Sequence, residues 1–75
     1  MNNKSNYLIV GQTYRLTYPI YDDFDEGIKP EIEIVQVIKK LQFGYLIKNL
    51  ELNSIYEIKF YILNECKIEK YETDL

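Results

Sequence analysis

Apolar side chains recur at every second position along most of this chain, and this pattern limits the folds it can adopt. Three segments carry the pattern, and their alternating residues are Tyr14, Leu16, Tyr18 and Ile20; Leu41, Phe43, Tyr45 and Ile47; and Tyr56, Ile58, Phe60 and Ile62. A period of two indicates β-strands with one buried face, because successive side chains of a strand point to opposite sides of the sheet. The abundant Ile and Tyr also fit a half-buried pleated surface. The chain is therefore predicted to be all-β.

Turn signals separate these segments and set the number of strands. Gly11 to Thr13 precedes the first strand, and Asn53-Ser54 is a plausible hairpin turn before the strand that begins near Tyr56. Leu63 to Cys66 predicts one short turn, after which Lys67 to Tyr71 adds a last strand with Ile68 facing the core. The prediction is a sheet of five short strands.

The segment from Glu31 to Leu41 allows two interpretations. As a strand it contains a β-bulge near Ile34 and Val35, because the alternation slips by one position there. As a helix it begins after Pro30 and carries apolar residues three or four positions apart. Its high share of β-branched residues favours the strand. The alternative is an α+β fold with a helix at about residues 31–42 packed on an antiparallel sheet.

The layout of the chain resembles that of the SH3-like small β-barrels. The segments that carry the resemblance are Val10 to Leu16 at the start and Leu63 to Ile68 near the end, and it covers about Val10 to Tyr71. The resemblance implies a five-stranded barrel whose long early loop lies where peptide-binding members carry an acidic, ligand-facing loop. Those members also use a Trp in their groove. This chain has no Trp, so binding of proline-rich peptides is not implied.

The length of 75 residues predicts one domain, 1–75, with residues 1–6 and 72–75 frayed. The chain has a single cysteine, Cys66, which cannot close an internal disulfide. Because there is no His, a zinc site would lack ligands, and no metal or cofactor is predicted. The unpaired cysteine and the absence of a long apolar leader predict a cytoplasmic location and no membrane partner.

Acidic residues are concentrated in one segment, from Tyr21 to Glu33. It holds Asp22, Asp23, Asp25, Glu26, Glu31 and Glu33 against Lys29 alone, which gives a local net charge of −5. Because the whole chain has a net charge of −3, the remaining residues together carry +2. A nucleic-acid-binding protein would show the opposite pattern, a clustered Lys/Arg face. A calcium loop is not predicted either, because Phe24 stands where such a loop needs an oxygen ligand.

The acidic segment predicts a surface that binds another protein. Its aromatic residues lie within a negative field, an arrangement that suits a partner with a basic surface. The candidate partner-binding residues are Tyr21, Asp22, Asp23, Phe24, Asp25, Glu26, Glu31, Glu33, Tyr45 and Tyr61. The chain is thus predicted to be a non-enzymatic module, of the type of a phage or mobile-element inhibitor of a larger bacterial, nucleic-acid-handling protein. Catalysis is not predicted, since there is no His and no glycine-rich phosphate loop.

Three alternatives stay open at this point. A homo-oligomeric structural or adaptor barrel would pair its exposed strand edges with a second copy, as a possible homodimer. A nucleic-acid-binding barrel would combine tyrosine stacking with the basic side chains of Arg15, Lys39, Lys40, Lys48 and Lys59. In the third alternative the acidic segment has no partner and is a solvated loop that keeps the chain soluble.

Overall fold

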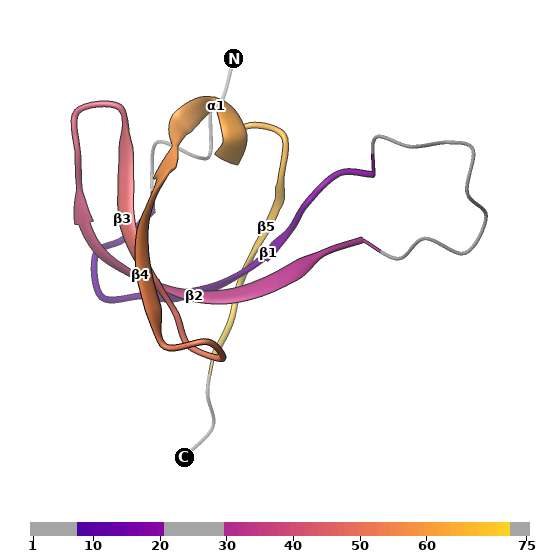
Figure 1. The fold of residues 1–75 in the computed structure, drawn as a ribbon, viewed down its shortest axis with the longest axis horizontal. Coiled ribbons are helices and arrows are strands. Elements are labelled where there is room, and N and C mark those ends of the chain that lie inside the picture. The colour runs from indigo at the N-terminus through magenta and orange to yellow at the C-terminus, as the bar shows by residue number, and fades with distance from the viewer. Residues whose placement is uncertain (1–7, 21–29, 73–75) are drawn as a thin grey trace.

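The computed structural model describes residues 8–20 and 30–72, which form one antiparallel sheet and one short helix (Figure 1). The strands are β1 (Thr13–Thr17), β2 (Ile32–Lys40), β3 (Gly44–Asn49), β4 (Ser54–Lys59) and β5 (Lys67–Lys70), and helix α1 (Phe60–Leu63) lies between β4 and β5. The strand order in the sheet is β4-β3-β2-β1-β5. The prediction of an all-β chain with five strands is therefore confirmed.

The sheet is strongly curved, but it is not closed into the predicted barrel. Consecutive strands are neighbours from β1 to β4, and the chain then crosses through α1 to pair β5 with the other side of β1. In Figure 1 the two edge strands, β4 at the left and β5 further to the right, are separated across the view. Within the described residues β4 pairs only with β3 and β5 only with β1, so these two edges stay unjoined. The chain leaves β4 as the helical turn α1, and β5 then pairs with β1 instead of β4.

Strand β2 settles the ambiguous segment, and the helix predicted as an alternative at about residues 31–42 is wrong. The strand pairs with β1 on one side and with β3 on the other, so tertiary pairing decides its conformation. The bulge predicted near Ile34 and Val35 lies later, because the register with β3 shifts between Val37 and Lys39. The alternation looked irregular because Ile32, which is 48 % exposed, points away from the core that holds Val35 and Val37.

A single helical turn, α1, replaces the end of the strand predicted over residues 56–62. The strand stops at Lys59, and the turn that follows buries Leu63 completely. Phe60, the first residue of the turn, packs edge-on against the ring of Tyr45, with ring centroids 5.6 Å apart and planes at 77°. Edge-to-face contacts of this kind are favourable for aromatic pairs. The turn thereby covers one end of the concave face of the sheet.

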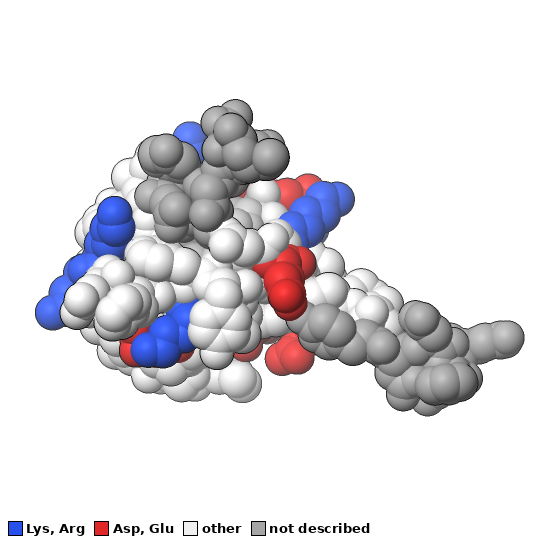
Figure 2. Space-filling model, turned by 90° about the horizontal axis from the view of Figure 1, so that it is seen from above, with Lys and Arg blue, Asp and Glu red and all other residues white. Residues whose placement is uncertain are grey.

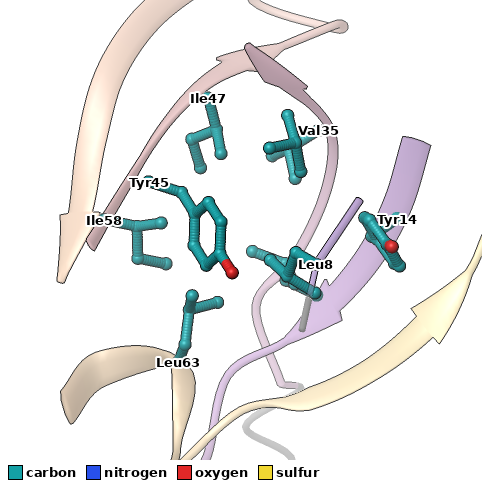
Figure 3. Packing of buried hydrophobic residues seen from close by; sticks show 9 residues of the cluster. Leu8, Tyr14, Val35, Tyr45, Ile47, Ile58 and Leu63 are labelled. Carbon is teal, nitrogen blue, oxygen red and sulfur yellow. The ribbon is translucent and has the colours of Figure 1, made fainter. Parts of the chain in front are cut away.

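The core lies on this concave face and draws on every strand except β5, together with α1 and the segment before β1. The buried apolar residues are Leu8, Tyr14, Leu16, Val35, Val37, Tyr45, Ile47, Ile58 and Leu63 (Figure 3). Partly buried side chains then pack around them, and these are Tyr18, Tyr56, Phe60, Ile62 and Ile68. The inward positions predicted for Ile58 and Ile68 are confirmed. The core is small, as expected for a chain of this length.

Candidate functional site

The concave face changes from apolar to polar at the end where β2 begins. Glu33 lies on the same side of β2 as Val35 and Val37, because residues two apart in a strand share a face. Its carboxylate Oε1 accepts a hydrogen bond from the Tyr18 hydroxyl at 2.9 Å and another from the Tyr56 hydroxyl. We call these three residues the tyrosine–glutamate cluster.

The tyrosine–glutamate cluster links β2 both to its neighbour β1 and to β4, which is not its neighbour. Tyr18 directly follows β1, Glu33 lies on β2, and Tyr56 lies on β4, with β3 between β2 and β4 in the strand order. The curvature of the sheet lets the β4 tyrosine reach over β3 to the β2 carboxylate. Hydrogen bonds to a charged group are stronger than neutral ones, so this contact fixes the shape of the open end of the sheet.

Burial and the Glu33 carboxylate keep the hydroxyls of the cluster protonated. Burial raises the pKa of Tyr18 and of Tyr56 far above the usual value near 10, and the hydrogen bond to Glu33 raises both further. The pKa of the Cys66 thiol is also raised, mainly by burial and then by the nearby charge of Glu33. This thiol donates a hydrogen bond to the carbonyl oxygen of Ile62 at 3.3 Å. The arrangement therefore holds the Glu33 carboxylate in place, and burial of Cys66 disfavours the thiolate form of its side chain.

The structure places only part of the predicted partner-binding set. Six of its members lie outside the described residues, and these are Tyr21, Asp22, Asp23, Phe24, Asp25 and Glu26. Glu31 and Glu33 lie together at the start of β2, and Glu31 is exposed. Tyr61 lies on α1 and is 68 % exposed. Glu31 and Glu33 thus belong to one end of the sheet, whereas Tyr61 belongs to the helical turn after β4.

Tyr45 is not at the surface, which corrects its prediction as a partner-binding residue. Its side chain is 1 % exposed, and Figure 3 shows the ring among core residues, near Ile58 and Leu63. The reason is its register, because Tyr45 lies opposite Ile58 on the concave face. Burial also raises its pKa, although a hydrogen bond from the backbone of Leu8 acts in the opposite direction.

Sequence reasoning missed Tyr18 and Tyr56 as the partners of Glu33. A signal was nevertheless present, because Glu33 keeps the period of Val35 and Val37 and so points toward the core. A carboxylate on an inward face needs hydrogen-bond donors. The tyrosine hydroxyls supply them from positions 15 and 23 residues away in the sequence.

Comparisons of this chain with known protein families, with curated proteins and with solved structures find no match. Residues 8–20 and 30–72 contain no group of three or more His, Cys, Asp or Glu side chains placed to hold a metal ion. In the same part of the chain, no helix is both long and apolar enough to cross a membrane.

The tyrosine–glutamate cluster predicts a loss of stability at alkaline pH. The pKa of Tyr18 and of Tyr56 is raised in the folded state above the unfolded value near 10. Their contribution to stability is therefore fully present below about pH 10 and is lost as the pH rises further, because the unfolded chain releases these protons first. Urea unfolding measured between about pH 8 and pH 11 should show this decline.

The matched variant for this experiment is Tyr18→Phe/Tyr56→Phe. It is expected to be less stable than the parent at neutral pH, because Glu33 loses both donors. Its stability should then fall less steeply above about pH 10. Parallel pH profiles for parent and variant would show that the two hydroxyls ionise as readily in the folded chain as in the unfolded chain.

Proposed function

We propose that this chain is a non-enzymatic protein-binding module that docks its acidic, aromatic-bearing segment, residues 21–33, on a basic surface of a larger protein. The observation that carries the proposal is the charge distribution: the segment has a net charge of −5, and the rest of the chain has +2. A field of one sign that is confined to one segment steers association with a surface of the opposite sign. Small inhibitors from phages and mobile elements that occupy the phosphate-binding groove of a bacterial enzyme would act in this way.

The described residues at the two ends of the acidic segment support this role. Thr17 pairs with Ile32 in the sheet, and the backbone N–H of Tyr18 donates to the carbonyl oxygen of Glu31 at 2.8 Å. The Tyr18 hydroxyl also bonds to Glu33. The segment therefore leaves and rejoins the sheet at neighbouring strands. A fixed base lowers the conformational entropy that a binding segment loses when it meets its partner.

The proposal predicts that neutralising the segment slows association. The test variant is Asp22→Asn/Asp23→Asn/Asp25→Asn/Glu26→Gln, and it should fold as the parent does, because solvated charges contribute little to stability. Pull-down from a bacterial lysate supplies the partner, and surface plasmon resonance then measures its rates. The association rate constant should fall about tenfold or more at low salt, and the difference from the parent should shrink as salt is added.

The control variant is Glu51→Gln/Glu72→Gln, which removes two exposed acidic charges outside the segment. It should change the association rate constant much less than removing two charges within the segment, as in Asp22→Asn/Asp23→Asn. Equal effects of these two double variants would mean that only the total charge matters. An unchanged rate constant for the fourfold variant at low salt would contradict the proposal and leave the segment as a solvated loop.

A further inference from the structure

Lysine side chains and exposed aromatic rings lie at the end of the sheet where β2 ends and β3 begins. We call this group the lysine–aromatic end, and its members are Lys39, Lys40, Phe43, Lys59 and Tyr61. Figure 2 shows several basic side chains on the side of the molecule where β2 and β3 are joined in Figure 1, with an acidic side chain beside them, and most of the visible acidic side chains further toward the other side. The function proposed above does not use this group.

The sheet topology brings these residues to the same end of the sheet. Lys39 and Lys40 occupy the last two positions of β2, so their side chains point to opposite faces at the same end of the sheet. The turn that follows contains Phe43, whose carbonyl oxygen accepts a hydrogen bond from the N–H of Phe60 at 2.8 Å. Lys59 is the last residue of β4 and directly precedes Phe60, so it lies beside this turn. The residue after Phe60 on α1 is Tyr61, which supplies the second exposed ring.

The two rings of the group are exposed although burial would stabilise them. Phe43 is 61 % exposed and Tyr61 is 68 % exposed, whereas Phe60 between them in the fold packs on the core. Aromatic rings gain much more than small side chains from contact with another surface. The lysines at the end of β2 are exposed, and the Lys59 side chain is 44 % exposed although its Nζ lies 3.3 Å from the Glu57 carboxylate.

We infer that the lysine–aromatic end binds single-stranded nucleic acid, with its three lysines at the phosphates and its two rings stacked on bases. Surfaces that hold single strands combine positive charge along the backbone with aromatic platforms for successive bases. Stacking requires bases that are free of a partner strand, so a duplex would use the lysines and leave the rings without a role. An acidic peptide would likewise pair with the lysines but would have no bases to stack on the two rings.

The net negative charge of the chain does not prevent binding at this end. Strand β2 runs from Ile32 to Lys40 at the lysine–aromatic end, a length of about 26 Å along the strand at 3.3 Å per residue. The Debye length is about 10 Å at 0.1 M ionic strength, so the field of Glu31 and Glu33 at the start of β2 is largely screened there. The net charge of the whole chain is therefore a poor guide to the local charge of this surface. Arg15 takes no part in it, because its guanidinium is paired with Glu69 at 2.6 Å.

The test is fluorescence anisotropy of a labelled oligothymidylate titrated with the full chain. At low salt we expect a dissociation constant of about 10⁻⁴ to 10⁻⁶ M, typical of non-specific binding. The logarithm of the binding constant should fall with the logarithm of salt concentration with a slope of about −2, at roughly −0.7 for each of three lysine–phosphate contacts. Absence of binding at low salt would overturn the inference.

Two variants separate the charges from the rings. Lys39→Gln/Lys40→Gln/Lys59→Gln should weaken binding about tenfold or more and bring the salt slope close to zero. Phe43→Ser/Tyr61→Ser should weaken binding about tenfold or more and leave the slope unchanged, because stacking is not ionic. The control is Lys67→Gln/Lys70→Gln, which removes two exposed charges on β5 and should change binding less than about twofold. Circular dichroism confirms that each variant keeps its fold.

Other occupants of this end would give different results. If a poly-glutamate peptide competes as well as the oligothymidylate does, the surface binds polyanions in general and the inference is wrong. Equal affinity for a duplex, or an unchanged affinity after removal of both rings, would also overturn it. None of these variants alters residues 21–33, so this inference and the proposed function can fail independently.

Discussion

Replacing Gly44 with Ala should strongly destabilise the chain. Gly44 is buried opposite Lys59 in the β3–β4 pair. A Cβ atom at this position would lie 2.1 Å from the carbonyl oxygen of Ile58 and 2.9 Å from the Lys59 Cα. These are backbone atoms of the neighbouring strand, so no side-chain rotation can relieve the overlap. Relief requires β3 and β4 to move apart, and this would break the ladder that carries Tyr45 and Ile58 into the core.

The expected cost is large for so small a chain. We expect a loss of about 3 kcal/mol or more, at the upper end of overpacking effects. That loss corresponds to a fall in melting temperature of roughly 12–24 °C for a domain of this size. Thermal unfolding followed by circular dichroism measures the shift. If the Gly44→Ala variant melts within a few degrees of the parent, the β3–β4 register described here is wrong.

Gly11→Ala is the matched control for Gly44→Ala. Gly11 has φ +93°, which L-residues rarely adopt, but nothing lies within 4 Å of a Cβ built there. Its substitution should cost about 1–2 kcal/mol through backbone strain alone. The difference between the two glycine variants then isolates the steric overlap between β3 and β4.

The elements that could be predicted from the sequence are those in which one face is apolar and the other polar. The last strand is an example, because Ile68 is its only large apolar residue before Tyr71 and it packs inward as predicted. The helical turn at Phe60–Leu63 could not be predicted, because Phe60 and Ile62 continue the two-residue period of β4. Leu63 does not belong to this two-residue period, yet it is fully buried, and its burial in the core decides the conformation there.

The charge of the candidate site could be predicted, but its geometry could not. The excess of acidic residues from Tyr21 to Glu33 can be read directly from the amino-acid sequence. The hydrogen bonds that hold Glu33 depend on how far the sheet curves, because they come from Tyr18 after β1 and Tyr56 on β4. Curvature is a property of the whole sheet, which no local pattern records.

Sequence alone also failed to separate the buried tyrosines from the exposed ones. Tyr45 and Tyr61 had equal standing as surface candidates, yet their side chains are 1 % and 68 % exposed. The difference arises because Tyr45 lies opposite Ile58 in the sheet, whereas Tyr61 follows the end of β4 on the outer side of α1. Sequence reasoning named Lys39, Lys40 and Lys59 as part of a nucleic-acid-binding alternative, but it did not separate them from Arg15 and Lys48 or join them to Phe43, because the members of the lysine–aromatic end meet only after the β2–β3 turn is formed.

Leu16→Ala should remove a large part of the total stability. Leu16 is fully buried on β1, the strand that pairs with β2 on one side and with β5 on the other. It lies directly opposite both Glu33 and Ile68, so it joins the polar end of the concave face to the core. Truncation of a buried Leu to Ala costs about 2–5 kcal/mol, since the cavity left behind collapses only in part. A chain of this length has a total stability of only roughly 4–11 kcal/mol.

Leu52→Ala provides the same chemical change at the surface. Leu52 is 73 % exposed in the turn between β3 and β4. Its truncation should change the free energy of unfolding by less than about 0.5 kcal/mol. Urea unfolding of both variants measures the difference in their free energies of unfolding. The comparison requires that the free energy of unfolding has the same dependence on urea concentration in both variants. If the two leucine variants differ by less than about 1 kcal/mol, Leu16 does not lie in a packed core, and the concave face assigned here is the wrong one.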